Sequence, residues 1–266
     1  MDFYKYQGTG NDFIMIDDRL HVFPTNNKGY IEQLCNRRFG IGSDGLILLQ
    51  TQLDGSYYMQ YFNSDGAESS MCGNGGRCFA QFIFDLGLAE NEIAFYAIDG
   101  KHRATKMYTE QGQPWIALEM IPVSKVIRQG EGMYELNTGS PHYVSFIAEP
   151  VSEIPLNQWA KEIRYNETYT AAGINVNYVN LLGLKDLCMR TYERGVEDET
   201  YSCGTGATAA ALSAALYANL PSGKHVIKIN VPGGNLAVQF TRLPEIGRFS
   251  DIWLMGPAKQ VFKGQL

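Results

Sequence analysis

The sequence lacks the features that attach a protein to a membrane or to nucleic acid. It contains no apolar run of about 18 residues, the length that predicts a transmembrane helix. It also has no run of like charges, and its net charge of −6 disfavours nucleic acid or an anionic membrane surface, because both bind basic patches. The N-terminus shows no basic segment followed by an apolar one, so we expect no signal peptide and a cytoplasmic protein.

Disulfide, metal and cofactor patterns are missing as well. An odd number of cysteines fits reduced thiols better than a secreted disulfide framework, and no Cys-x-x-Cys pair indicates a zinc site. The segment Gly204-Thr-Gly-Ala-Thr-Ala209 fits a dinucleotide-binding pattern, but no Asp or Glu stands between Cys203 and Glu245 to hold a ribose. We therefore expect neither a metal nor a cofactor. The five cysteines are Cys35, Cys72, Cys78, Cys188 and Cys203.

One motif occurs twice: Cys72 and Cys203 are each followed by Gly-x-Gly and then by an apolar run. The match extends upstream, because a glutamate precedes each cysteine by four residues, Glu68 in one half and Glu199 in the other. A duplicated unit explains this most simply. We expect a first half at 1–118, to which a final strand at 254–266 returns, and a second half at 119–253.

The pattern of apolar residues predicts an α+β fold of two pseudo-symmetric domains. Short strands bounded by Asp-Gly turns alternate with few helices, and the longest helices follow the two cysteines. The alanine-rich segment 206–219 is slim enough for strands to wrap closely around it. Each domain is therefore expected to be a curled, barrel-like, mixed or antiparallel sheet around one central helix, with the active site in a cleft between the domains.

A cysteine at a helix N-terminus is chemically activated. Unpaired N–H groups and the helix dipole favour the thiolate and also bind a carboxylate. The glycines at 73, 75, 204 and 206 let a ligand oxygen reach those N–H groups. Two such thiols on opposite faces of one amino acid could remove and return its α-proton, while the N–H donors stabilise the enediolate-like charge.

Together these motifs resemble the diaminopimelate epimerase family, and the likeness runs essentially from end to end. The segments that carry it are Gly8-Thr-Gly-Asn-Asp-Phe13, Phe62-Asn63-x-Asp65-Gly66, Cys72-Gly-Asn-Gly-Gly-Arg77-Cys78, Gly139-x-Pro-His142, Asn175-x-Asn177, Tyr192-Glu-Arg-Gly195, Glu199-x-x-x-Cys203-Gly-Thr-Gly206, Pro232-Gly-Gly234 and Gly256-Pro257. The resemblance implies cofactor-independent interconversion of LL- and meso-diaminopimelate for lysine and peptidoglycan synthesis, and a homodimer.

The resemblance also implies a role for individual residues. Cys72 and Cys203 become the acid/base pair, and His142 and Glu193 match positions expected to modulate the thiol pKa values. Two positions depart from well-known members of the family: Gly45 stands where some carry glutamine, and Ser140 stands where many carry asparagine. The loss of an amide there affects recognition of the distal, non-reacting end of the substrate. The implied substrate-binding residues are Asn11, Asn63, Gly73, Asn74, Asn175, Glu193, Arg194, Gly204 and Thr205.

Three alternatives remain at this point. A proline or hydroxyproline racemase of the same fold group would leave Glu193 and Arg194 little to bind, because its substrate has no second amino-acid end. An isomerase of the phenazine-biosynthesis type would lack the paired cysteines. A thiol-bearing binding protein without catalysis would tolerate the loss of either cysteine.

Overall fold

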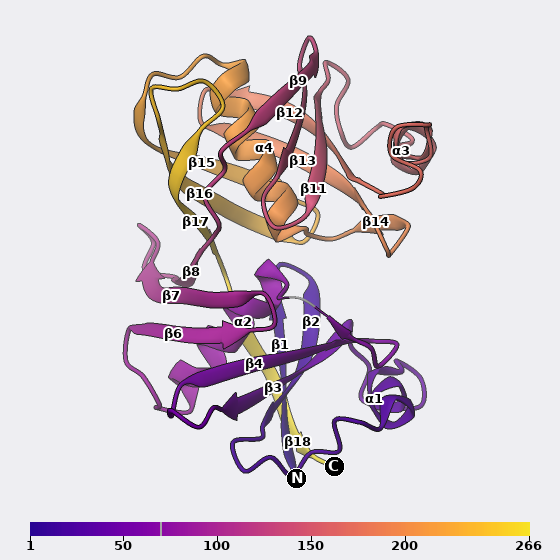
Figure 1. Cartoon of the computed structure of the whole chain (residues 1–266), viewed down its shortest axis with the longest axis vertical. Helices are drawn as coiled ribbons and strands as arrows, with labels where there is room; N and C mark the ends of the chain where they lie inside the picture. Colours follow the sequence, from indigo (N-terminus) through magenta and orange to yellow (C-terminus); the bar gives the residue numbers. More distant parts are fainter. Residues whose placement is uncertain (70) are drawn as a thin grey trace. The chain divides into compact units, whose positions relative to one another are not determined.

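The computed structural model describes residues 1–69 and 71–266, and the chain forms two compact units. Unit 1 comprises residues 1–118 and 256–266, and unit 2 comprises residues 119–255. Both chain termini belong to unit 1, where Asp2 pairs with Gln265 (Figure 1). None of the helices in the described part of the chain has the length and apolarity to cross a membrane.

Unit 1 is a mixed sheet that curls around helix α2 (Gly73–Asp85), with a second helix, α1 (Lys28–Cys35), packed on the other side of β3. The short strand β5 (Glu68–Ser69) pairs only with β4 among the described residues. In the order of their pairing, the other strands are β18 (Lys259–Gln265), β1 (Asp2–Gly8), β2 (Asn11–Asp17), β3 (Gly45–Thr51), β4 (Tyr57–Asn63), β6 (Glu92–Ala97), β7 (Gly100–Tyr108) and β8 (Pro114–Glu119).

Unit 2 repeats this plan around helix α4 (Gly204–Tyr217), with α3 (Leu156–Arg164) in the place of α1. The short strand β14 (Asp198–Thr200) pairs with β13 as β5 pairs with β4. In the order of their pairing, the other strands are β9 (Val126–Gly130), β10 (Met133–Asn137), β11 (Pro141–Phe146), β12 (Asn175–Gly183), β13 (Asp186–Glu193), β15 (Gly223–Val231), β16 (Gly234–Arg242) and β17 (Phe249–Gly256).

The two sheets share one sequence of pairing directions. In each, the third and fifth contacts are parallel, β2–β3 with β4–β6 in unit 1 and β11–β12 with β13–β15 in unit 2, and the other five are antiparallel. The parallel contacts enclose a helix each time, because parallel strands need a crossover connection. The predicted α+β fold of two related halves, each with a curled sheet around a central helix, is confirmed.

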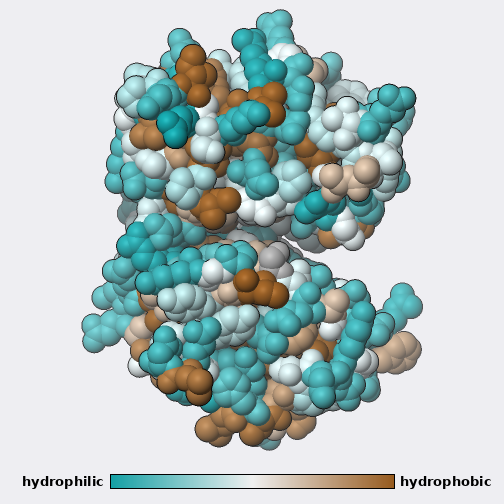
Figure 2. Space-filling model, viewed as in Figure 1, coloured by the Kyte–Doolittle hydropathy of each residue, from teal (hydrophilic) through white to brown (hydrophobic). Residues whose placement is uncertain are grey.

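Burial explains why these helices are so apolar. In α2, Gln81 and Asp85 are the two residues that are not buried, and α4 is buried continuously from Gly206 to Ala215. A helix covered on nearly all sides needs apolar or small side chains around its whole circumference. By contrast, hydrophilic residues prevail on the face of each unit shown in Figure 2.

Helix α3 and the first strand, β1, have no counterpart among the sequence expectations. Helix α3 begins after Pro155, and its apolar residues recur at spacings of three and four, an amphipathic pattern that the sequence does contain. In strand β1 the side chains of Phe3 and Tyr6 are buried, but so is that of Lys5, and this charged residue interrupts the apolar pattern that would indicate a strand.

Candidate functional site

Cys72 caps the N-terminus of α2, as the motif predicts. Its backbone is extended (φ −97°, ψ 135°), and its carbonyl oxygen accepts the first helical bond from Gly76 N at 2.7 Å. The first-turn N–H groups therefore have no carbonyl partner within the helix, which makes this end a binding place for negative charge. The thiol is partly exposed, whereas Asn74 in the same turn is buried.

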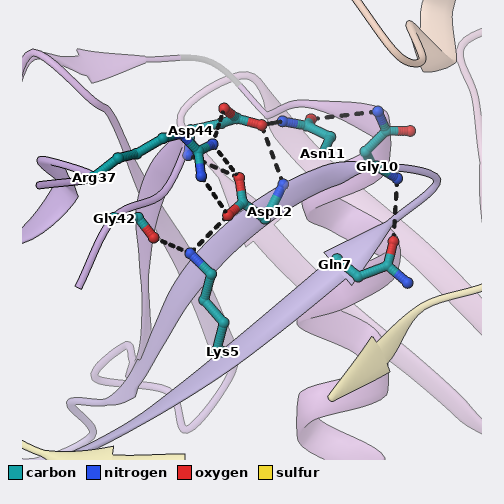
Figure 3. Close-up of polar contacts among 9 residues, drawn as sticks. Lys5, Gln7, Gly10, Asn11, Asp12, Arg37, Gly42 and Asp44 are labelled. Carbon is teal, nitrogen blue, oxygen red and sulfur yellow. Dashed lines mark hydrogen bonds and ion pairs between the residues drawn. The ribbon is translucent and has the colours of Figure 1, made fainter. Parts of the chain in front are cut away.

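Asn11 connects the Cys72 thiol to the side chain of Asp44, and Figure 3 shows the contact with Asp44. Its Nδ2 donates to Asp44 Oδ2 at 2.5 Å, and since a carboxylate only accepts, Asn11 Oδ1 must point the other way. That oxygen accepts from Asn74 Nδ2 at 3.3 Å and from the Cys72 thiol at 3.6 Å. Asn11 therefore stabilises the protonated form of Cys72.

Four charged side chains behind Asn11 form a closed network. Arg37 bridges two carboxylates, contacting Asp12 at 2.6 Å and Asp44 at 2.7 Å, and Lys5 contacts Asp12 at 2.8 Å and the Gly42 carbonyl. Burial alone would raise the pKa of Asp12, but the hydrogen bonds from Arg37 and Lys5 outweigh it and hold that pKa at about 2. The two cations balance the two anions, so the network orients Asp44 and adds no net charge.

Cys203 occupies the equivalent cap of α4 in unit 2. Its backbone is again extended (φ −116°, ψ 111°), and its carbonyl accepts from Ala207 N at 2.8 Å. The sulfur lies 3.4 Å from Thr205 Oγ1, which in turn lies 2.9 Å from His142 Nε2. Gly206 is required here, since a Cβ at this position would come within 2.6 Å of Asn177 Oδ1.

Asn177 fixes the tautomer of His142. Its Nδ2 donates to the Tyr143 carbonyl at 2.9 Å and lies 3.2 Å from His142 Nδ1, while its Oδ1 accepts from Thr191 at 3.0 Å. Since an amide nitrogen only donates, His142 Nδ1 must accept and the ring proton must sit on Nε2. Nε2 then donates to Thr205, whose own hydroxyl proton is free to point at the Cys203 sulfur.

His142 is neutral in this arrangement. It is fully buried, and desolvation, with a smaller contribution from the charge of Arg194, lowers the pKa of His142 to about 3. It therefore acts as a hydrogen-bond donor through Thr205 and not as an imidazolium. Asn177 was not among the predicted site residues, although it belongs to the segment Asn175-x-Asn177.

The two thiol environments are related by the duplication. The offset that places Cys72 on Cys203 also places Asn11 on His142 and Asn74 on Thr205. In each unit, the residue of the strand contacts the residue of the helix, at 3.3 Å in unit 1 and 2.9 Å in unit 2. The two units therefore share the same strand-to-helix contact, which joins two amides in unit 1 and an imidazole and a hydroxyl in unit 2.

Gly45 lies where the resemblance leads to an expectation of glutamine, and the structure explains the glycine. A Cβ at this position would come 2.5 Å from the Phe62 carbonyl oxygen and 2.6 Å from the Tyr61 ring. Gly45 pairs with Asn63, the exposed last residue of β4. Tyr61 has thus taken the space that a longer side chain on β3 would use.

We predict that Gly45→Gln destabilises the protein and does not improve substrate binding. The clash is with backbone as well as with an aromatic ring, so overpacking is expected to cost about 1–3 kcal/mol. Urea unfolding of Gly45→Gln and, as a matched control, of Gly183→Gln measures this cost, because Gly183 lies in a strand without a positive φ and nothing lies within 4 Å of a Cβ there. A Gly45→Gln variant as stable as the control would contradict the assignment of this space to Tyr61.

Asn175 holds the turn and strand end around it. Its two amide protons go to Ser140 Oγ at 2.8 Å and the Pro141 carbonyl at 2.9 Å, and its Oδ1 accepts from Arg194 N at 2.9 Å. Ser140, the second departure from the expected pattern, is therefore a partner of Asn175. Since both protons are used, Asn175 positions Arg194 and has only acceptor capacity left for a ligand.

Arg194 presents an exposed guanidinium. Nη1 donates to the Ala172 carbonyl at 3.0 Å, and no carboxylate among residues 1–69 and 71–266 pairs with it. Its stem passes over Gly173 (φ +74°), where a Cβ would lie 2.5 Å from Arg194 Cδ. The neighbouring Glu193 accepts from Thr200 Oγ1 at 3.0 Å. The end of β13 thus offers a cation and an anion side by side.

No metal centre competes with this interpretation in the described part of the chain. No group of three or more His, Cys, Asp and Glu side chains there is arranged to hold a metal ion. A surface hollow in unit 1 is lined by His21, residues 50–54 and Tyr58, and it contains none of the predicted site residues.

Comparison with known proteins agrees with the motifs. The family model described as diaminopimelate epimerase matches residues 3–126 and 134–260. The diaminopimelate epimerase of Flavobacterium psychrophilum is 48% identical over 263 residues, which cover 99% of each chain. The chain belongs to the diaminopimelate epimerase family. A second diaminopimelate epimerase, from Methanocella arvoryzae, is 37% identical and covers 99% of this chain and 96% of its own.

Solved structures extend the fold beyond the diaminopimelate epimerases. A phenazine biosynthesis protein of the PhzF family from Bacillus anthracis gives a TM-score of 0.75 at 15% identity, covering 100% of this chain and 98% of its own. A probable proline racemase from Agrobacterium radiobacter gives 0.68 at 14% identity, covering 100% and 92%. At such identities the likeness shows the fold alone.

Proposed function

We propose that this member of the diaminopimelate epimerase family interconverts LL- and meso-diaminopimelate without a cofactor. The observation that carries the proposal is 48% identity over 99% of the chain to a protein named diaminopimelate epimerase. It is supported by two cysteines that cap buried helices in related surroundings. The substrate is inferred from family membership, and the acid/base pair is inferred from the two cysteines at the helix N-termini.

In the proposed reaction, one cysteine is a thiolate and the other a thiol. The thiolate takes the α-proton, so that the C–H bond breaks and an S–H bond forms, and the carboxylate becomes enediolate-like. The thiol then gives its proton to the opposite face of the α-carbon, which inverts the centre and leaves the second sulfur as the thiolate. First-turn amides at Gly73, Asn74, Gly204 and Thr205 would stabilise the developing charge.

The distal amino-acid end requires different groups. We assign its carboxylate to Arg194, since a guanidinium binds a carboxylate through two parallel hydrogen bonds. Its ammonium group is assigned to Glu193, with Asn11, Asn63 and Asn175 as further polar contacts. These assignments follow the family motif residue by residue.

A proline or hydroxyproline racemase is the rival function, since proteins with these names share the fold. They are 14% and 13% identical to this chain, and so carry no argument about its substrate. A cyclic imino acid has no second amino-acid end to bind the exposed Arg194. The homodimer and the cytoplasmic location expected above stay predictions.

Incubation with LL-diaminopimelate in deuterated water tests the proposed function. We expect one deuteron to be incorporated at the inverted α-carbon for each meso product, because the proton that is delivered comes from an exchangeable thiol. Proton NMR and mass spectrometry of the product measure the amount of deuterium incorporated and its position at the α-carbon. Racemisation of proline without any exchange of the α-hydrogen of diaminopimelate would contradict the proposal and favour a proline racemase.

A further inference from the structure

Arg77 is the largest fully buried side chain in the described part of the protein, and the proposed reaction gives it no role. It lies on α2, one helical turn after Gly73. Nη2 donates to Asn74 Oδ1 at 2.9 Å and to Thr9 Oγ1 at 3.1 Å, while Nη1 approaches the Gly73 carbonyl at 3.4 Å. Within residues 1–69 and 71–266 no carboxylate contacts it, and Nε has no partner.

The surroundings are built to accept this guanidinium but leave its charge uncompensated. Gly8 makes room, since a Cβ there would lie 3.4 Å from Arg77 Nη2 and 3.3 Å from Cys78 Sγ. Burial raises the pKa of Cys78 to about 12, so its thiol is neutral and supplies no counter-charge. The carboxylates of Asp12 and Asp44 are already balanced by Lys5 and Arg37 (Figure 3).

Such a charge is costly to bury without a partner. Desolvation lowers the pKa of Arg77 to about 10, and negative charge on Cys78 or Cys72 would oppose that shift. Arg77 is thus still protonated at neutral pH. A cation held in this way, without an anion, has capacity to stabilise one that forms nearby.

Unit 2 has no equivalent charge. The offset that places Cys72 on Cys203 places Arg77 on Thr208, whose hydroxyl donates to the Gly204 carbonyl at 3.0 Å. Both side chains contact the carbonyl of the first helical residue, so the position is conserved between the units while the charge occurs in unit 1 alone. The helix dipoles are matched, and Arg77 is an electrostatic difference between the two caps.

We infer that Arg77 is a positioning residue that supplies the counter-charge for the thiolate of Cys72, acting from behind the first turn of α2. The inference rests on the proposed function, in which Cys72 must lose and regain a proton in every cycle. Asn11 Oδ1 favours the thiol, as shown above, and Arg77 offsets this preference when the proton leaves. Arg77 also holds Asn74 with its Nδ2 toward Asn11, which keeps the Asn11 contact in place.

Thiol alkylation tests the inference without using the substrate. The full-length protein carrying Cys203→Ser is treated with iodoacetamide across a pH series, and modification of Cys72 is followed by peptide mass. Burial raises the pKa of Cys35, Cys78 and Cys188, so these thiols react slowly. We expect Arg77→Met to raise the midpoint pH of Cys72 alkylation by about one unit or more, which slows modification at neutral pH about tenfold.

Arg77→Lys separates charge from hydrogen bonding. The lysine keeps the cation, so the Cys72 midpoint should return to within about half a unit of the original value. The matched control places Arg77→Met in a protein carrying Cys72→Ser and follows Cys203, whose midpoint should not move. Because loss of an unpaired buried charge is often tolerated, Arg77→Met should fold, with a thermal midpoint within a few degrees of the parent.

Three results would overturn the inference: an unchanged Cys72 midpoint in folded Arg77→Met, an equal shift at Cys203, or an Arg77→Met protein that does not fold, which would make Arg77 a structural residue. If the deuterium experiment fails while Arg77→Met still raises the midpoint pH of Cys72 alkylation, the substrate assignment is wrong and the effect of Arg77 on the thiol is retained.

Discussion

Replacing either Cys72 or Cys203 with alanine is expected to abolish inversion of diaminopimelate, lowering kcat/KM by about 10⁴-fold or more. The proposed reaction needs a base on one face of the α-carbon and an acid on the other, and a single general acid or base contributes about 10²–10⁴-fold. Alanine removes the proton carrier and leaves the first-turn amides in place. The interconversion is measured by chiral chromatography of the product, which separates the LL and meso forms.

The two variants should differ in what they still do. The remaining thiol can exchange the α-hydrogen of the one stereoisomer that presents this hydrogen to it, so each variant should label a different isomer in deuterated water. Cys188→Ser is the matched control: burial raises the pKa of that thiol, and activity should stay within about twofold. Inversion that survives in Cys72→Ala, or label in the same isomer from both variants, is incompatible with a two-thiol reaction.

Local sequence was sufficient to predict the two caps. The Cys-Gly-x-Gly motif determines a turn, a helix start and a small-residue surface within a few positions, and the structure places Cys72 and Cys203 at those helix starts. The recurrence of the motif, with Glu68 and Glu199 upstream, also predicted the duplication that the strand pairing now shows. Such information needs no knowledge of distant contacts.

The contacts that tune the thiols depend on strand register, which the sequence does not display. Parallel pairing of β11 with β12 places His142 beside Asn175 and Val144 beside Asn177, and this brings Asn177 to the imidazole. Similarly, Asp44 reaches Asn11 because β2 and β3 pair in parallel, with Phe13 opposite Gly45. These side-chain contacts join residues some 30 positions apart along the chain, and the register of strand pairing determines which residues meet.

Buried charge was equally hidden from the sequence. An arginine in an apolar helix looks like a surface residue that snorkels, and Arg77 stands only five residues after Cys72. Its complete burial follows from the sheet that closes around α2, and from Gly8, which makes space for it. The same closure fills the space beside Gly45 with Tyr61, so a departure from the expected pattern reflects packing.

Arg194→Met is expected to lower kcat/KM for diaminopimelate about 100-fold or more, mainly through a higher KM. The guanidinium is exposed and free of a carboxylate partner in the described chain, so it is available to a distal carboxylate, and bidentate charged hydrogen bonds of this kind are among the strongest. Because the distal end does not react, its loss should act chiefly on binding. Initial rates over a range of substrate concentrations separate KM from kcat.

Arg190→Met is the control, because this arginine already pairs with Glu199 through two contacts of 2.6 Å and donates to the carbonyls of Val151 and Ile154. Its loss should lower the thermal midpoint and leave KM within about threefold. Gly173→Ala offers a second variant, since its Cβ would displace the stem of Arg194 and should raise KM in the same direction. An unchanged KM in folded Arg194→Met would remove Arg194 from the distal site and return the proline-type substrate to consideration, because nothing would then distinguish a second amino-acid end.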